Sequence, residues 1–140
     1  AIILFGVPDK VDAHARFLDT GADASGCVTL QYADKTVVLT YSKTAQGVIG
    51  SEIQGEDGVI RIPRISKLVD MTFTPLNGEE RLLTGPEGKY RQMSYEMAFF
   101  KRFIEEPNRY RPYYQYVSNL ALNVNRVMKQ AREKAGIFFE

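Results

Sequence analysis

Apolar and polar residues alternate along much of the first half of the chain. The clearest alternation covers residues 27–32 and, after a short polar turn, residues 36–41, and a less regular one covers residues 11–18. A period of two is typical of β-strands, and two such runs joined by a short turn are typical of an antiparallel hairpin. These patterns predict three strands, with a polar loop at residues 20–26 between the first and the second.

A second hairpin is predicted between Gly47 and Pro63. Its two apolar runs, residues 48–53 and 59–62, flank a turn that contains Asp57-Gly58. An Asp-Gly pair between β-branched runs favours a tight turn, because glycine adopts positive φ without steric cost. We therefore expect the two runs to pair with each other.

The period changes in the second half of the chain. Alternation continues in a strand at residues 69–74 and in a short run at 80–83 that pairs back on it. Apolar residues then recur at helical spacing over 93–104, and a longer helix follows, with Pro112 in its first turn and Gly136 as its cap. Strands followed by helices predict an α+β domain: an open, mostly antiparallel β-sheet with helices packed on one face.

The chain opens with an apolar run, residues 1–5, that ends in Gly6. A glycine after such a run is typical of a helix end, where it accepts the left-handed backbone conformation. We interpret this opening as the last turn of a helix, and the chain as a fragment of a longer protein.

Composition narrows the class of protein. The chain has 140 residues, and 44% of them are hydrophobic, which is enough for a domain with a core. Lys and Arg number 18 against 17 Asp and Glu, a net charge of +1 that argues against a nucleic-acid partner. No apolar run approaches the roughly 18 residues of a membrane span, so no membrane partner is expected. The single cysteine, Cys27, excludes an internal disulfide and fits a cytoplasmic location.

Residues that carry catalytic chemistry are sparse. His14 is the only histidine, and a lone histidine without a nearby carboxylate or cysteine pair is more often structural than catalytic. Cys27 lies between apolar neighbours, which favours a buried, unreactive thiol. No spacing of His, Cys, Asp and Glu matches a metal site, and no glycines match the G-x-G-x-x-G cofactor motif. We predict no catalytic, metal-binding or cofactor-binding residues in this chain.

Arginines and tyrosines are mixed at residues 109–116. Such mixtures occur in proteins that bind single-stranded nucleic acid. The nearly neutral charge of the chain instead favours a connector between the two helices, with its tyrosines packed at the sheet edge or at a subunit boundary.

Six short motifs together resemble a known family. They are FGVPDKV at residues 5–11, TGAD at 20–23, LQY at 30–32, GSEIQGEDGVI at 50–60, MSYE at 93–96 and VMKQAREKAGIF at 127–138. In this order, and over nearly the whole chain, they look like the C-terminal domain of the Gfo/Idh/MocA oxidoreductases. Within that family they look most like the dihydrodiol and sugar dehydrogenase branch.

The resemblance implies that residues 1–140 form a single C-terminal domain for substrate binding and dimerisation. In this family an N-terminal Rossmann domain binds NAD or NADP, and that domain is absent from this chain. The family's catalytic lysine follows a Glu-Lys-Pro motif that this sequence lacks, and its histidine is not matched by His14. The implied protein is an NAD(P)-dependent oxidoreductase acting on a sugar, polyol or related alcohol. The fragment is expected to bind no cofactor and to have no activity alone.

By the same resemblance, the loop after the fifth strand and the loop before the first helix face the missing domain. Four donors in these loops suit a hydroxyl-rich ligand and are the expected substrate-binding residues: Arg64, Lys67, Tyr90 and Arg91. The alternative for these residues is that they are simply exposed loop positions.

The expected partners are a second copy of the chain, paired through the open sheet face, and a sugar or polyol held together with the missing domain. Two other hypotheses stay open. One is a free-standing sugar- or protein-binding module with the same fold, and the other is single-strand nucleic-acid binding through residues 109–116.

Overall fold

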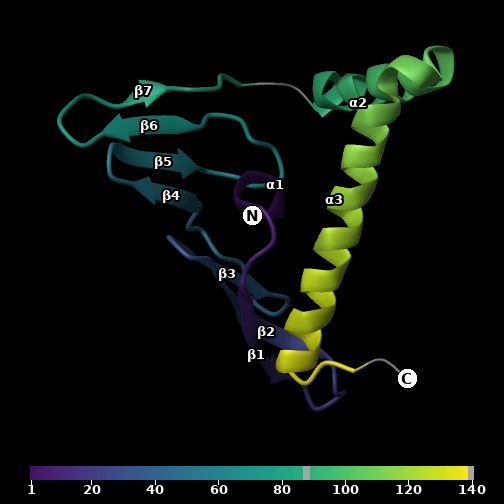
Figure 1. Cartoon of the computed structure of the whole chain (residues 1–140). Coiled ribbons are helices and arrows are strands. Elements are labelled where there is room, and N and C mark those ends of the chain that lie inside the picture. The colour runs from purple at the N-terminus through teal and green to yellow at the C-terminus, as the bar shows by residue number, and fades with distance from the viewer. Residues whose placement is uncertain (87–88, 139–140) are drawn as a thin grey trace. The chain divides into compact units, whose positions relative to one another are not determined.

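The computed structural model describes residues 1–86 and 89–138, without the side chains at positions 89, 90 and 92 (Figure 1). The chain divides into two compact units. The first comprises Ala1–Gly47 and Glu106–Glu140, and the second comprises Val48–Glu105. Each unit has an antiparallel sheet of its own.

The first unit is built from three strands and two helices. They are α1 (Ile2–Phe5), β1 (Lys10–Phe17), β2 (Asp23–Gln31), β3 (Thr36–Ser42) and α3 (Pro107–Lys134). The strands lie in the order β1-β2-β3 and pair antiparallel. Leu30 is opposite Val11 on one side and Val37 on the other, so these apolar residues share one face of the sheet.

Helix α3 packs on this apolar face (Figure 1). The core consists of Val11, Ala13 and Leu30 from the sheet and Val127 and Ala131 from the helix. The two helical residues are four positions apart, so they lie one above the other on the same side of α3. Leu30 is only 1% exposed, which makes it the best-buried side chain among the described residues.

The end of α3 follows from Gly136. This residue has φ 72°, and its N–H donates to the Glu133 carbonyl at 3.2 Å, while the N–H of Ile137 donates to the Arg132 carbonyl at 2.9 Å. This pair of bonds is the Schellman arrangement, which satisfies carbonyls left free in the last turn. The predicted cap at Gly136 is confirmed.

The second unit holds four strands and one helix. They are β4 (Ser51–Gly55), β5 (Gly58–Ile62), β6 (Thr72–Pro75), β7 (Arg81–Leu82) and α2 (Lys89–Glu105). The strand order is β4-β5-β6-β7. The hairpin predicted around Asp57-Gly58 is confirmed, since Gly55 pairs with Gly58 across it and Gly58 has φ 149°. A Cβ at Gly58 would also lie 2.7 Å from the Cα of Pro75, so the position requires glycine.

The fold class is confirmed as α+β with open antiparallel sheets and helices. The structure differs from the prediction in having a three-stranded and a four-stranded sheet where one sheet was expected. That residues 1–140 act as one domain stays a prediction.

Several local predictions are wrong, among them the strand expected at residues 69–74, which begins only at Thr72. The polar loop expected at residues 20–26 is partly strand, because β2 begins at Asp23, where its backbone pairs with Phe17 of β1, and β3 pairs with it from Ser25 onward. The hairpin strand expected from Val48 begins only at Ser51, and Val48 and Ile49 are 97% and 93% exposed. The connector expected at residues 109–116 is helical.

The helical connector follows from the two prolines. Helix α2 ends at Glu105 and α3 begins at Pro107, so Pro107 and not Pro112 opens the long helix. A proline suits the first helical position because its missing N–H would have no partner there. Pro112 lies inside α3, where it removes one backbone hydrogen bond. None of the helices in the described ranges is long and apolar enough to cross a membrane.

Candidate ligand pocket on the four-stranded sheet

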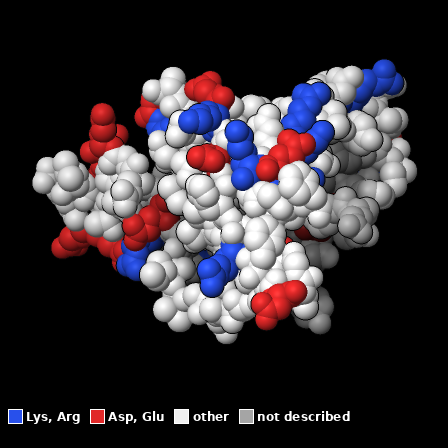
Figure 2. Space-filling model, turned by 90° about the horizontal axis from the view of Figure 1, so that it is seen from below, with Lys and Arg blue, Asp and Glu red and all other residues white. Residues whose placement is uncertain are grey.

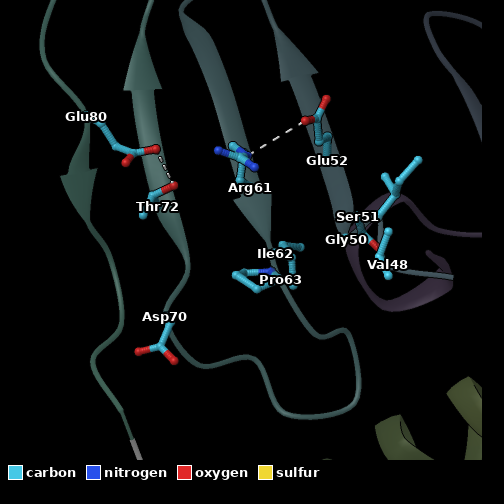
Figure 3. A pocket seen from close by; sticks show the side chains of 11 residues that line it. Val48, Gly50, Ser51, Glu52, Arg61, Ile62, Pro63, Asp70, Thr72 and Glu80 are labelled. Carbon is cyan, nitrogen blue, oxygen red and sulfur yellow. Dashed lines mark hydrogen bonds and ion pairs between the residues drawn. The ribbon is translucent and has the colours of Figure 1, made fainter.

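A pocket of about 440 Å³ lies on one face of the second unit's sheet (Figure 3). Its floor follows from strand register, since Arg61 is opposite Glu52 on β4 and opposite Thr72 on β6. Opposite residues in an antiparallel sheet point to the same side. The neighbouring row of Ile53, Ile60 and Phe73 therefore lies on the other side, and this face stays polar.

Carboxylates dominate the polar groups of the pocket. The Arg61 guanidinium lies 3.9 Å from the Glu52 carboxylate, and Thr72 donates its hydroxyl proton to Glu80 at 2.8 Å (Figure 3). Asp70, two residues before the start of β6, adds a third carboxylate below Thr72 (Figure 3). The pocket thus contains one guanidinium and three carboxylates, and the exposed ion pair at 3.9 Å leaves both of its partners able to bind a ligand.

Asp70 belongs to a strained turn between β5 and β6. Leu68 and Asp70 both have positive φ, 51° and 55°. Side chains other than glycine rarely adopt this conformation, and each such residue costs roughly 1–3 kcal/mol. Ahead of them, the Arg64 carbonyl accepts bonds from the N–H groups of Lys67 and Leu68 at 3.0 and 3.1 Å, which closes a single helical turn.

The chemistry of the pocket suits a ligand rich in hydroxyl groups. Carboxylate oxygens accept hydrogen bonds from hydroxyls, and a guanidinium donates to their oxygens. Apolar atoms of Val48, Ile62 and Pro63 line the rest of the pocket and offer a surface for a carbon skeleton. Among the described residues, no group of three or more His, Cys, Asp and Glu is placed to hold a metal ion.

Three of the four predicted substrate-binding residues, Arg64, Lys67 and Arg91, are not among the residues that line this pocket. Arg64 and Lys67 belong to the turn that follows β5. Arg91 lies in the first turn of α2. Tyr90 is also on α2, but its side chain lies outside the described part of the chain. Their assignment to the substrate stays a prediction.

Sequence reasoning missed the residues that do line the pocket. The opposite charges of Glu52 and Arg61 could have been found from the hairpin register once the turn at Asp57-Gly58 was placed. Glu80 was not detectable in this way, because its approach to Thr72 depends on where the chain turns after β6.

A second polar group lies in the first unit, on the face of the sheet that α3 covers. Asp23 accepts a hydrogen bond from Lys43, which holds the pKa of the Asp23 carboxyl below its usual value, with a smaller contribution from Tyr41. Burial, followed by the hydrogen bond with Asp23, raises the pKa of Tyr41. These residues line a mainly apolar cavity of about 340 Å³ near the end of α3. Their mutual pairing gives them a structural role.

His14 and Cys27, which the sequence predicts to be structural and unreactive, lie opposite each other on β1 and β2. His14 is exposed, and Cys27 is free and half-buried, so the expectation of a buried thiol is wrong. The reason is that Cys27 lies on the face of the sheet opposite α3, which the core does not cover.

Basic and acidic side chains are interspersed over the face of the molecule that Figure 2 displays.

Known proteins are similar to this chain over nearly its whole length. No family model matches it. The chain is 33% identical over 143 residues to YgjR, an uncharacterised oxidoreductase of Escherichia coli strain K12. It is 32% identical over 139 residues to IolU of Bacillus subtilis strain 168, a scyllo-inositol 2-dehydrogenase (NADP(+)). The chain is a homologue of part of these oxidoreductases. The matches confirm the resemblance to a Gfo/Idh/MocA C-terminal domain.

The matches cover 99% of this chain but only 41% of YgjR and 42% of IolU. The chain therefore spans less than half the length of either relative. Solved structures agree in fold. The chain superposes over 96% of its length on a candidate oxidoreductase of Klebsiella pneumoniae, with TM-score 0.66 and 21% identity, covering 44% of it. It superposes equally far on the candidate oxidoreductase yvaA of Bacillus subtilis, with TM-score 0.69 and 16% identity, covering 45% of it.

The described part of this oxidoreductase homologue does not fit a dinucleotide. A nicotinamide cofactor is typically held at a glycine-rich turn between a strand and a helix of a parallel sheet. Every strand pair described here is antiparallel, and the sequence has no G-x-G-x-x-G. No step of a reaction is therefore assigned to a cofactor bound by these residues.

Proposed function

We propose that this chain is the C-terminal domain of an NAD(P)-dependent oxidoreductase that acts on a sugar, polyol or related alcohol. The observation that carries the proposal is the homology over 99% of the chain to two oxidoreductases, one of them named as an NADP(+)-dependent inositol dehydrogenase. A polyol such as an inositol presents several hydroxyls around an apolar ring. The pocket offers the matching groups: acceptors on Asp70 and Glu80, and a donor on Arg61.

In this proposal, two parts of the protein have different roles: one binds the cofactor and moves the hydride, and this chain binds the substrate. NAD or NADP, and the residues that move the hydride, belong to the part of the protein that precedes this chain. This chain supplies part of the substrate pocket, including Arg64, Lys67, Tyr90 and Arg91 as contacts that face that part. A substrate held on one side only is bound but not oxidised, so the chain alone has no catalytic activity. The proposed location is the reducing cytoplasm, which suits the free Cys27.

The proposal also includes a homodimer formed through the open sheet face of the first unit. On the face opposite α3, cross-strand pairing aligns Asp12, Thr29 and Val38 in one row. Val38 is 61% exposed, although it lies in the middle of an otherwise regular strand. An exposed β-branched residue in a polar row suits pairing with a like face, which would shield it from water.

The pocket is tested by a Glu80→Gln substitution in the full-length enzyme. The neutral side chain is a weaker acceptor, so KM for the polyol should rise by about tenfold while kcat changes by less than about twofold. The matched control is Glu79→Gln, which removes the neighbouring, exposed carboxylate outside the pocket.

Two results would overturn the proposal. One is a full-length protein that oxidises no sugar, polyol or related alcohol with NAD or NADP. The other is a Glu80→Gln enzyme with the same KM as the Glu79→Gln enzyme. Binding of a polyol by a natural protein that has no cofactor domain would instead favour a free-standing binding module.

A further inference from the structure

We infer that Thr84 is a positioning residue that holds the strained turn at Leu68–Asp70 and thereby presents the Asp70 carboxylate to the ligand pocket. The inference rests on the proposed function for its ligand, a hydroxyl-rich alcohol. The structural part of the inference, that Thr84 holds the turn in place, depends only on the hydrogen bonds of Thr84 and not on the identity of the ligand.

The turn requires an external restraint. Leu68 and Asp70 both have positive φ, and only Val69 separates them. Leucine has no side-chain polar group to compensate for this backbone conformation, and the turn contains no glycine to relieve it. Residues in such conformations persist when the surrounding structure over-determines them, and they cluster at ligand sites.

Thr84 provides the restraint from the segment that follows β7. Its hydroxyl donates to the Leu68 carbonyl at 3.2 Å and accepts from the N–H of Met71 at 3.1 Å. One small group therefore bridges the backbone before and after Asp70. The main chain strengthens this link, since the N–H groups of Leu83 and Thr84 both approach the Met71 carbonyl, at 2.8 and 3.4 Å.

The hydroxyl is the essential feature of Thr84. A hydroxyl is both donor and acceptor, and the bridge uses both functions. Valine has the same shape but neither function, so it would leave the Leu68 carbonyl and the Met71 N–H without this partner. The turn would then relax toward negative φ, which rotates the peptide planes on either side of Asp70 and moves its carboxylate. Thr84 itself is not among the residues that line the pocket.

The test compares three variants of the full-length enzyme by hydrogen exchange and by kinetics. Thr84→Val should speed exchange of the Met71 amide by about tenfold or more, since its bond to the hydroxyl is lost, and should raise KM for the alcohol by about fivefold with kcat within about twofold. Thr84→Ser keeps the hydroxyl and should restore both values. Asparagine tolerates the left-handed conformation, so Asp70→Asn should leave exchange of the Met71 amide unchanged. It removes the carboxylate from the pocket, so it should raise KM for the alcohol.

Each outcome decides one part. Unchanged exchange of the Met71 amide in Thr84→Val refutes the claim that Thr84 holds the turn. Faster exchange with an unchanged KM refutes the claim that this turn affects the pocket. An unchanged KM in Asp70→Asn also refutes that effect, without any variant at Thr84. If no alcohol is a substrate, the proposed function fails, while the exchange data still decide whether Thr84 holds the turn.

Discussion

The ring of Tyr41 lies across Gly26, its direct partner on the neighbouring strand. A Cβ at Gly26 would be 2.9 Å from both the Cε1 atom and the hydroxyl oxygen of that ring, and it would also meet the carbonyl of His14. Backbone atoms of β1 cannot move aside without breaking sheet bonds. Gly26 is therefore fixed by close packing and not by an unusual φ, which differs from Gly58.

Gly26→Ala should lower the free energy of unfolding by about 1–3 kcal/mol, as extra atoms do in a packed interior. The matched control is Gly47→Ala, because a Cβ at Gly47 meets no atom within 4 Å. Chemical denaturation followed by circular dichroism measures both. Equal stability of the two variants would contradict the packing described for Tyr41.

The pairing of Asp23 with Lys43 makes a prediction about pH. The hydrogen bond from Lys43 lowers the pKa of Asp23 in the folded state, so its contribution is present above the unfolded pKa and is lost as pH falls through the folded value. Asp23→Asn should therefore reduce stability at neutral pH and should have no effect at a pH below the folded pKa. Asp19→Asn, an exposed carboxylate in the adjacent turn, is the control. A deficit of the same size at both pH values would contradict the assignment.

At the scale of elements, the strands and helices were largely predictable because period and turn chemistry agree with the tertiary structure. Residues 27–32 and 36–41 alternate, and Gly136 ends its helix as expected. The errors arose where tertiary pairing overrides local pattern. The polar start of β2 is a strand because its backbone pairs with β1, and the apolar pair at Val48 does not join β4.

The pocket was less predictable than the fold for the same reason. Arg61 and Glu52 could be matched from the register of one hairpin. Glu80 and Thr84 lie outside that hairpin, on either side of β7. The bond between Glu80 and Thr72 and the bond between Thr84 and Leu68 depend on backbone geometry that no local sequence pattern encodes. The positive φ of Leu68 is likewise invisible in sequence, since leucine gives no sign of it.

The open face of the first unit's sheet gives a prediction for assembly. Val38→Arg places a charge in the middle of the row that the proposed homodimer buries, so the variant should be a monomer where the parent is a dimer. Val38 is exposed, so unfolding of the protomer should change by less than about 0.5 kcal/mol. Val48→Arg, at a fully exposed position of the second unit, is the control.

Analytical ultracentrifugation at tens of micromolar, roughly the range for a modest interface, distinguishes the two states. A parent chain that is strictly monomeric would contradict the dimer. A Val38→Arg variant that still dimerises would show that a different surface is used.

At the scale of the whole molecule, we propose that this chain binds the substrate and that the rest of the protein transfers the hydride. Homology covers nearly all of the chain and less than half of each relative, which is the relation expected of one domain of a two-domain enzyme. The antiparallel sheets described here carry a polar pocket and no dinucleotide motif.

The most direct test of this division compares the full-length protein with the 140-residue chain in one assay. Formation of NADH or NADPH is followed by absorbance with a panel of sugars and polyols. We expect reduced cofactor from the full-length protein with at least one alcohol and none from the chain alone. Cofactor reduction by the 140-residue chain alone would contradict it.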